Sequence, residues 1–402
     1  MFRLTHYLRE ILNPTPIRAV RAPSGPVVIW NLIRRCNLSC KHCYSISGDV
    51  DFPGELTTAE VLHVMEDLKA FGVPVLILSG GEPLMRRDIF SISARAKEMG
   101  FYVGLSTNGT LIDDTLADRI RDTGYDYVGV SLDGIGATHD RFRGKPGGYD
   151  AALAGLRRLR HRDVKVGVRF TMTEDNAAEL PALLDLVERE GFPKFYLSHL
   201  VYAGRGNKNR QDDAAWSTTR AAMDLLIDRA WTWAQRRADV EVVTGNNDAD
   251  AVYLLHWATR VAPASVRGLW TKLAQWGGNS SGVNIANIDN LGNVHPDTMW
   301  WHYTLGNVRE RPFSAIWRDL ADPIMAGLKQ RPRAIGGRCG ACAYFDVCGG
   351  NTRVRAMRIS GDPWAEDPGC YLTDAEIGCS GEGPRLLNTP YRGLRHAAPL
   401  RA

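Results

Sequence analysis

The sequence contains no long uncharged hydrophobic run. A membrane-spanning helix needs about 18 or more such residues in succession, so we expect no membrane partner. The N-terminal stretch MFRLTHYLREILNPTP also lacks the features of a secretory signal peptide, because charged residues interrupt its apolar residues and no small-residue cleavage site follows. These two absences predict a cytoplasmic protein.

Dense runs of lysine or arginine are missing as well, and the net charge is only +4. A nucleic-acid-binding protein usually carries a clustered basic patch, so we expect no nucleic-acid partner. A mildly basic balance is compatible with a small anionic substrate. The 402 residues, 44% of them hydrophobic and 23% charged, are typical of a globular protein with room for two domains.

Cysteine is absent from the long central part of the chain, although the chain has eight cysteines in all. Three of them lie between Cys36 and Cys43, and the other five begin at Cys339. In a reducing cytosol such clusters are metal ligands or redox sites rather than disulfides. We therefore expect a metal or redox site near each end of the sequence.

Short apolar strands alternate with helices over the first half of the chain. The pattern predicts strands at 26–33, 75–78, 101–105, 127–132, 164–171 and 194–200. Helices are predicted at 57–70, 86–98, 111–122, 149–161 and 176–190. Continuous apolar strands that alternate with helices are typical of a parallel sheet covered by helices. The predicted fold is therefore α/β, a partial (β/α)6 TIM-like barrel with its functional groups at the C-terminal ends of the strands.

The pattern changes after the sixth strand, and the chain is predicted to divide into five parts. These are an N-terminal extension (1–25), the barrel core (26–213), a tryptophan-rich helical connecting region (214–276), a smaller C-terminal domain (277–379) and a flexible tail (380–402). Within the C-terminal domain, 283–288 and 294–295 are predicted to pair as a hairpin around a turn at 289–293.

The first cysteine cluster, CNLSCKHC, has the spacing CxxxCxxC and follows the first predicted strand. Thiolates are soft ligands that suit an iron–sulfur cluster or zinc. A 4Fe–4S cluster needs four ligands, so three cysteines leave one iron open to the amino and carboxylate groups of a small molecule. The alternative is a structural zinc ion whose fourth ligand is His42 or a distant residue.

A second motif, SGGEP at 79–83, follows the second predicted strand. Together the two motifs resemble the signature of the radical S-adenosylmethionine (SAM) superfamily. The resemblance implies that Cys36, Cys40 and Cys43 hold the catalytic 4Fe–4S cluster. It also implies that the SAM methionine is bound by the turn residues Gly80, Gly81, Glu82 and Pro83. A glycine turn lets the backbone approach a ligand, and a carboxylate suits an ammonium group.

Further SAM contacts follow from the same resemblance. Ser106 and Asn108 come after the third strand and would face the cofactor, whereas Ser131 and Arg143 would hold its ribose or carboxylate. Each has a simpler interpretation. Asn108 precedes a glycine in an ordinary turn pair, and Arg143 is compatible with a solvated surface charge.

The second cluster consists of Cys339, Cys342, Cys348 and Cys370, with the spacing C-x2-C-x5-C-x21-C. Four thiolates can close a site around zinc or around an iron–sulfur cluster. The C-terminal region resembles the SPASM domain of some radical SAM enzymes. That resemblance implies that these four cysteines hold an auxiliary 4Fe–4S cluster.

The C-terminal region also departs from a full SPASM domain, which holds two auxiliary clusters. Asp297 and Thr352 stand where ligand cysteines are expected, and the glycine-rich stretch 277–281 contains no cysteine. One auxiliary cluster is therefore predicted to be lost and one retained, which gives two 4Fe–4S clusters in total. Cys379 is left over and is expected to be a free thiol in the flexible tail.

Longer stretches, including IWNLIRRCNLSCKHCYS, VGVSLDGIGATHDRFRG and FYLSHLVYAGRGN, resemble the NirJ family of haem d1 biosynthesis. The resemblance implies reductive cleavage of SAM to a 5′-deoxyadenosyl radical that attacks the propionate side chains of 12,18-didecarboxysirohaem and leads to their removal. It also implies a low-potential electron donor such as flavodoxin or ferredoxin. Candidate aromatic walls for the tetrapyrrole are Trp300, Trp301 and Tyr303, and candidate axial ligands are His199, His256, His295 and His302. The alternative is that the tryptophans belong to the core and that each histidine is a hydrogen-bonded structural residue, which is the commoner case for both.

Three other functions are compatible with the sequence. A SPASM enzyme that modifies a ribosomally made peptide shares the cluster motifs, but such enzymes often carry an extra recognition domain for which the extension at 1–25 is too short. Another haem-pathway propionate decarboxylase shares every cluster residue. A non-catalytic interaction protein held together by zinc is the alternative outside enzymology.

Overall fold

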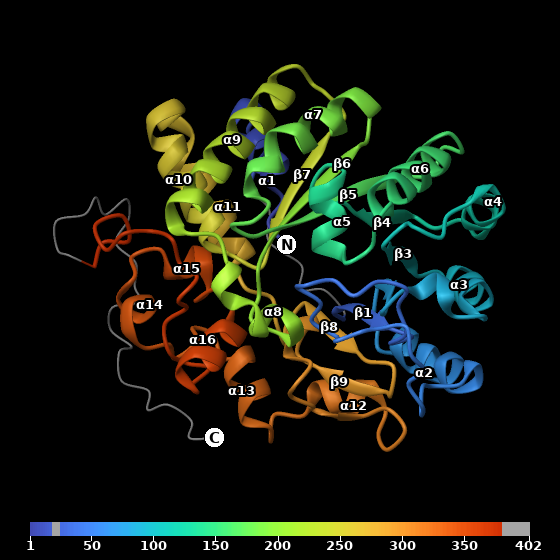
Figure 1. Ribbon diagram of the computed structural model, residues 1–402. Helices are drawn as coiled ribbons and strands as arrows, with labels where there is room; N and C mark the ends of the chain where they lie inside the picture. The colour runs from blue at the N-terminus through green and yellow to red at the C-terminus, as the bar shows by residue number, and fades with distance from the viewer. Residues whose placement is uncertain (18–24, 380–402) are drawn as a thin grey trace.

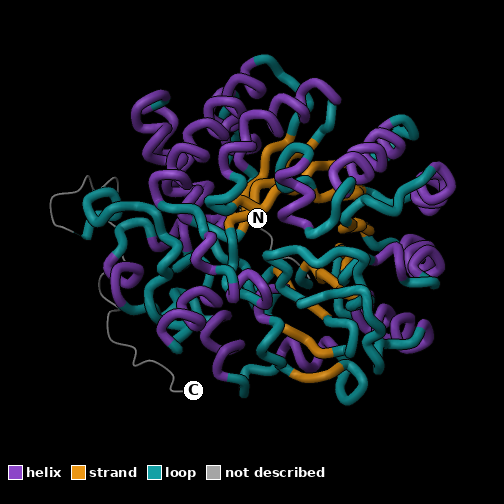
Figure 2. The backbone as a smooth tube through the Cα atoms, viewed as in Figure 1, coloured by secondary structure: helices purple, strands orange, loops and turns teal. Residues whose placement is uncertain are grey.

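The computed structural model describes residues 1–17 and 25–379. A single sheet organises this part of the chain, with the strand order β10-β9-β8-β1-β2-β3-β4-β5-β6-β7. Strands β1 to β8 run parallel to one another, whereas β9 pairs antiparallel with both β8 and β10. Figures 1 and 2 show the strands curving around a centre, with α2, α3, α4, α6 and α7 along the outside. The α/β class and the partial barrel are confirmed.

All six strands predicted for the barrel are present. They are β1 (Val27–Asn31), β2 (Val75–Ser79), β3 (Tyr102–Thr107), β4 (Tyr127–Ser131), β5 (Val166–Met172) and β6 (Lys194–His199). The connecting helices are α2 (Thr58–Ala70), η1 (Pro83–Met85), α3 (Ile89–Glu98), α4 (Asp114–Thr123), α5 (Ala137–Arg143), α6 (Gly148–Arg160), η2 (Ala177–Glu179) and α7 (Leu180–Glu190). Of these, η1 and α5 were not predicted.

The connecting region at 214–276 is not wholly helical, so that prediction was wrong. This region contains a seventh parallel strand, β7 (Glu241–Gly245), which pairs with β6 of the barrel. Around it lie α8 (Gly204–Lys208), η3 (Arg210–Asp212), α9 (Trp216–Gln235), α10 (Ala249–Val261), η4 (Pro263–Ser265) and α11 (Val266–Trp276). The strand is short and its apolar valines are buried against the sheet, so tertiary burial decides its conformation.

The predicted hairpin is confirmed as β8 (Ile285–Ile288) and β9 (Asn293–His295). Strand β8 also pairs in parallel with β1, so the barrel sheet continues across the domain boundary predicted at 276/277. The remaining elements are η5 (Thr298–Trp300), β10 (Gly306–Asn307), α12 (Phe313–Arg318), α13 (Pro323–Lys329), α14 (Gly337–Ala341), α15 (Phe345–Cys348) and α16 (Arg353–Ser360). The short helices α13 to α16 lie beside the barrel (Figure 1).

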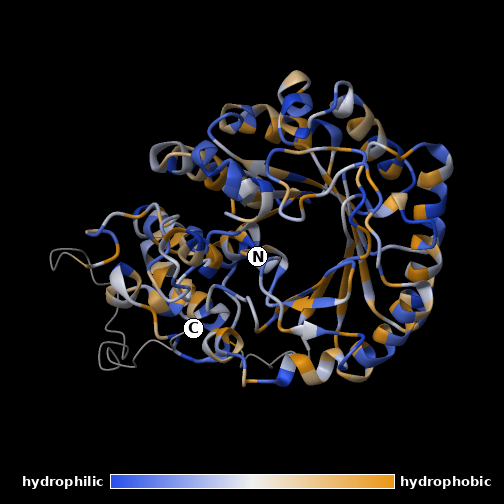
Figure 3. Cartoon of the chain, turned by 60° about the horizontal axis from the view of Figure 1, so that its bottom comes forward, coloured by the Kyte–Doolittle hydropathy of each residue, from blue (hydrophilic) through white to orange (hydrophobic). Residues whose placement is uncertain are grey.

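The first part of the N-terminal extension is packed against the barrel. Helix α1 (Leu4–Leu12) buries Leu4 and Leu8, and Phe2 forms an antiparallel bridge to Thr244 at the end of β7. In Figure 3 the barrel strands are largely hydrophobic, whereas the helices carry both hydrophobic and hydrophilic residues. Within the described residues, no helix is both long and apolar enough to cross a membrane. The predicted tail at 380–402 lies outside the described residues.

Candidate active site

A single large cavity is lined by the C-terminal ends of the barrel strands and the loops that follow them. Its empty space is about 1730 Å³, including the open mouth. The predicted residues that line it are Cys36, Cys40, Cys43, Gly80, Gly81, Ser106, Asn108, Ser131 and Arg143. Residues from four different strand ends therefore meet in one place, as expected for a barrel whose functional groups follow its strands.

The three cysteines of the first loop are buried or nearly so, and each sulfur faces polar donors. Asn108 Nδ2 lies 3.9 Å from the Cys36 sulfur, and a guanidinium nitrogen of Arg143 lies 3.5 Å from the Cys40 sulfur. Burial raises the pKa of the Cys36 thiol to about 12. Burial also opposes ionisation of Cys43, but hydrogen bonds from Ser45 and Ser47 outweigh it and lower that pKa. Donors aimed at sulfur suit an anionic iron–sulfur cluster.

The cysteine loop is held from outside by the segment after β6. Arg205 donates from Nε to the Cys40 carbonyl oxygen at 2.7 Å and from a terminal nitrogen to the Ser47 carbonyl at 2.8 Å. The backbone N–H of Arg205 also donates to the Cys43 carbonyl at 2.9 Å. Arg205 thus fixes the loop at three carbonyl groups, a role that the sequence did not reveal.

The glycine turn after β2 packs directly against the chain that enters the cysteine loop. The Gly81 N–H donates to the Ile33 carbonyl at 2.6 Å, and the Glu82 N–H donates to the Arg35 carbonyl at 2.9 Å. A Cβ atom at Gly80 would lie 2.3 Å from the Ile33 carbonyl oxygen, and one at Gly81 would lie 2.3 Å from the Arg35 carbonyl oxygen. Only glycine permits this approach, which sets the two predicted motifs side by side.

Glu82 and Pro83 lie behind the cavity wall rather than in its lining. The Glu82 carboxylate is fully buried and accepts hydrogen bonds from Thr107 Oγ1 at 2.7 Å and from the Asn108 and Leu84 N–H groups at 2.8 and 3.1 Å. Burial raises the pKa of Glu82 to about 6, although these hydrogen bonds oppose the increase. In this structure Glu82 joins the turn after β2 to the end of β3, and its contact with the SAM amino group stays a prediction.

Arg143 is not a solvated surface charge. It is buried and forms an ion pair with Asp133, which is wholly inaccessible to solvent. Asp133 Oδ2 accepts from Arg143 Nε at 2.5 Å, and Asp133 Oδ1 accepts from the Thr171 N–H at 2.6 Å. Because Asp133 neutralises it, Arg143 faces the Cys40 sulfur as one half of an ion pair rather than as a free cation.

Arg169 on β5 is another cavity residue that the sequence analysis missed. It lines the cavity, donates to Ser106 Oγ and lies over the Tyr196 ring at 5.4 Å. The parallel register places it beside Ser131 of β4. Of the carboxylates in the described residues, none lies within ion-pair distance of Arg169. One arginine inside an otherwise apolar strand, VGVRFTM, was the signal that could have identified it.

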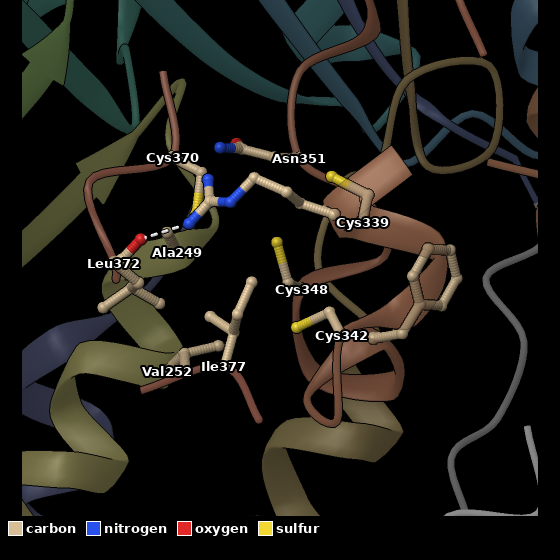
Figure 4. Close-up of a pocket in the computed structure, with 12 residues that line it drawn as sticks. Ala249, Val252, Cys339, Cys342, Cys348, Asn351, Cys370, Leu372 and Ile377 are labelled. Carbon is tan, nitrogen blue, oxygen red and sulfur yellow. Dashed lines mark hydrogen bonds between the residues drawn. The ribbon is translucent and has the colours of Figure 1, made fainter. Parts of the chain in front are cut away.

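The four cysteines of the second cluster line a separate pocket of about 410 Å³, again including its opening. Figure 4 shows Cys339, Cys342, Cys348 and Cys370 around one space, with Val252, Ile377 and Leu372 on its apolar side. Burial raises the pKa of all four thiols, that of Cys370 to about 11. Bound metal would have to replace four protons here, which is how thiolate sites are formed.

Two further observations concern the cysteines of the C-terminal region. Across residues 1–17 and 25–379, no three His, Cys, Asp or Glu side chains converge closely enough to hold one metal ion. Cys379 does not belong to a free tail, because its N–H donates to the Asp374 carbonyl at 2.9 Å and its thiol donates to the Arg338 carbonyl at 3.6 Å.

Most of the aromatic and histidine candidates lie away from the cavity. Trp300 is buried in a satellite core, and Trp301 and Tyr303 are not part of the cavity lining, so the prediction of aromatic walls there was wrong. The lining contains Tyr44 and Tyr196 instead. Of the four histidines, only His199 contributes to the lining, and its Nε2 is already paired with Asp250 Oδ2 at 3.0 Å.

The other three histidines are hydrogen-bonded or packed against aromatic rings outside the cavity lining. Both ring nitrogens of His295 are engaged, Nδ1 with the Tyr303 carbonyl at 2.6 Å and Nε2 with Asp289 at 3.4 Å. His302 stacks on Trp300, and burial lowers its pKa to about 4. The ring of His256 packs on Tyr344.

Comparison with known proteins agrees with this geometry. The Radical SAM superfamily matches residues 30–187. The chain is 58% identical over 398 residues to "Pre-heme d1 synthase" of Dinoroseobacter shibae, covering 98% of both chains. It is 46% identical over 356 residues to "Fe-coproporphyrin III synthase" of Methanosarcina barkeri, covering 88% of this chain and 89% of that relative.

Two solved structures resemble the chain in fold alone. SuiB of Streptococcus suis bound to S-adenosylmethionine gives a TM-score of 0.67 at 17% identity, covering 87% of this chain and 78% of SuiB. The structure of anSMEcpe with bound AdoMet gives a TM-score of 0.65 at 16% identity, covering 85% of this chain and 93% of that one.

Proposed function

Because the chain belongs to the radical SAM superfamily, with the SAM and 4Fe–4S cluster that this membership implies, we propose that it is an enzyme of haem d1 biosynthesis. Its substrate would be 12,18-didecarboxysirohaem, whose propionate side chains are attacked and then removed. The observation that carries this proposal is the 58% identity to "Pre-heme d1 synthase" over 98% of both chains. The cavity supports it, since one opening joins the cysteine loop to space for a large substrate.

The residues of the first site fit the expected cofactors. Cys36, Cys40 and Cys43 would hold the cluster, with the donors from Asn108 and Arg143 directed at its sulfur ligands. When bound, SAM and the reduced cluster supply a 5′-deoxyadenosyl radical that abstracts hydrogen from the substrate. The protein positions these groups and excludes competing reactions.

Different residues of the chain would bind different parts of SAM. The turn at Gly80 and Gly81 gives the methionine end close access to the backbone, and Ser106, Asn108 and Ser131 line the same wall. Arg169 binds the methionine carboxylate, because it is a cavity arginine without a carboxylate partner among the described residues. Arg143 stays paired with Asp133 and shields the charge of the Cys40 thiolate.

Cys339, Cys342, Cys348 and Cys370 would hold a second, auxiliary 4Fe–4S cluster, as their common pocket allows. A low-potential donor such as flavodoxin or ferredoxin would supply the electron that the reaction needs. Eight reduced cysteines fit a cytoplasmic protein.

The test is an anaerobic incubation of reconstituted protein with SAM, a reductant and 12,18-didecarboxysirohaem. The expected result is 5′-deoxyadenosine that depends on the tetrapyrrole, together with loss of side-chain mass from the tetrapyrrole. The Cys36→Ala variant should form neither product. Deoxyadenosine that forms equally without the tetrapyrrole, with an unchanged tetrapyrrole mass, would overturn the substrate assignment.

A second candidate is a different radical reaction on the side chains of a haem precursor. It is favoured by the 46% identity to "Fe-coproporphyrin III synthase". The same incubation distinguishes the two, because loss of carbon dioxide alone and loss of a whole propionate chain change the product mass by different amounts.

A further inference from the structure

The large cavity has a second polar region, which contains none of the residues proposed above to bind SAM. Its lining side chains come from four separate segments of the chain and are contributed by Asp248, Asn279, Ser281, Asp297 and Thr352. We call this set the polar lobe. Four of its members, Asn279, Ser281, Asp297 and Thr352, stand at positions or in the stretch where the sequence lacks the cysteines of a full SPASM domain. The structure shows that these positions open into the same cavity as the cysteine loop.

The lobe is held in place by its own hydrogen bonds. Ser281 Oγ donates to the Asp297 carboxylate, and the Ser281 N–H donates to Asn279 Oδ1 at 3.2 Å. Asn279 Nδ2 donates to Asp248 Oδ2 at 3.5 Å, which joins the two halves of the lobe. Behind it, the buried guanidinium of Arg333 donates to Asn279 Oδ1 at 3.1 Å. A network of this kind presents fixed polar groups to a ligand.

The lobe also borders the pocket of the second cysteine cluster. The Asn279 N–H donates to the Cys348 carbonyl at 3.3 Å. Asn351, which lines the cysteine pocket, accepts from the Asp248 N–H through Oδ1 at 2.8 Å. Thr352 follows directly after Asn351. A ligand seated in the lobe would therefore lie against the wall of the auxiliary site.

We propose that the polar lobe is the subsite for one edge of the tetrapyrrole, held between the SAM site and the auxiliary site. This rests on the proposed function and adds the position of the substrate. The lobe lines the same cavity as the cysteine loop, so a large flat substrate seated in this cavity can reach both. Burial raises the pKa of Asp297, and that of Asp248 to about 6, which lessens the negative charge met by an anionic substrate.

The first experiment fills the lobe at Thr352, whose hydroxyl now donates to the Asn246 carbonyl at 3.2 Å. In Thr352→Phe, we expect the Kd for 12,18-didecarboxysirohaem, from absorbance titration, to rise by about tenfold or more because the added ring occupies the subsite. The Kd for SAM should stay unchanged. Thr271→Phe, which adds the same ring on α11 away from the cavity, should change neither value.

Iron and sulfide content must show both clusters in each variant. Unchanged tetrapyrrole affinity in a fully loaded Thr352→Phe protein would overturn the subsite. Wild-type protein that binds SAM but no tetrapyrrole would instead overturn the proposed function, and the subsite with it.

If Thr352→Phe fails to retain its clusters, a proximity measurement replaces it. A variant with Cys36, Cys40 and Cys43 changed to alanine keeps only the auxiliary site. Added iron-bearing tetrapyrrole should then speed the electron-spin relaxation of the reduced auxiliary cluster, whereas the metal-free macrocycle should not. Equal relaxation with and without the substrate iron would refute the placement.

Discussion

Replacing Arg169 tests the assignment of the SAM carboxylate most directly. The side chain lies in the cavity wall, donates to Ser106 Oγ, and has no ion-pair partner among the carboxylates of the described residues. Arg169→Leu should therefore leave the folded protein without any new unpaired buried charge. What it should remove is the cation that meets the methionine carboxylate.

The size of the effect follows from the kind of bond. A hydrogen bond to a charged group contributes about 1.5–3 kcal/mol, which corresponds to a Kd about 10- to 150-fold higher. Arg169→Lys keeps the charge but loses the planar fork that Ser106 orients, so its Kd should lie between those of the wild type and Arg169→Leu.

Equilibrium dialysis of SAM against anaerobically reconstituted protein measures these values. Arg229→Leu is the matched control, because Arg229 forms ion pairs with Asp185 and Glu188 outside the cavity. Unchanged SAM affinity in Arg169→Leu, at full iron content, would refute the assignment. A raised Kd for the tetrapyrrole in Arg169→Leu would indicate that Arg169 binds a carboxylate of the substrate rather than the carboxylate of SAM.

Three further substitutions test other parts of the structure. Gly81→Ala would place Cβ 2.3 Å from the Arg35 carbonyl oxygen, so SAM affinity and the iron content of the first site should both fall in metal analysis and dialysis. Cys348→Ser should remove about half of the bound iron, since one of the two proposed clusters would lose a ligand, while SAM binding persists. Asp133→Asn leaves the Arg143 guanidinium buried without its carboxylate, so the free energy of unfolding in anaerobic denaturant titrations should fall by about 3–5 kcal/mol.

Each substitution has a control of the same chemistry. Gly48→Ala adds a Cβ with no neighbour within 4 Å and should keep full iron content. Cys379→Ser should keep both clusters, and Asp150→Asn, at an exposed position on α6, should change stability by less than about 0.5 kcal/mol. Normal SAM binding in Gly81→Ala, full iron in Cys348→Ser or unchanged stability in Asp133→Asn would contradict the respective interpretation.

The barrel was predictable because its signals are local. Strands such as β2 and β4 are short, largely buried apolar runs, and each is followed within a few residues by a helix. Strand β7 was missed because five residues between long tryptophan-rich helices carry too little periodicity. The pairing of β8 with β1 was beyond prediction, since it joins segments at opposite ends of the chain.

The candidate site was likewise predictable only where the signal is local. Gly80 and Gly81 could be placed because a motif fixes them, and the close carbonyl oxygens of the cysteine loop explain why the motif needs glycine. The partners of charged residues could not be predicted. That Arg143 is neutralised by Asp133, whereas Arg169 has no such partner, depends on which strands are neighbours. Sequence spacing does not contain that information.

The pairing of β1 with β8 has a consequence for how the protein is made. Ile29 and its partner Asn287 are about 260 residues apart. At a synthesis rate of ~5–20 residues per second, a ribosome needs on the order of 10 to 50 s to supply the second strand after the first. During that interval the edge of β1 that later pairs with β8 has no partner strand, so the barrel sheet is completed only after the C-terminal region has been made.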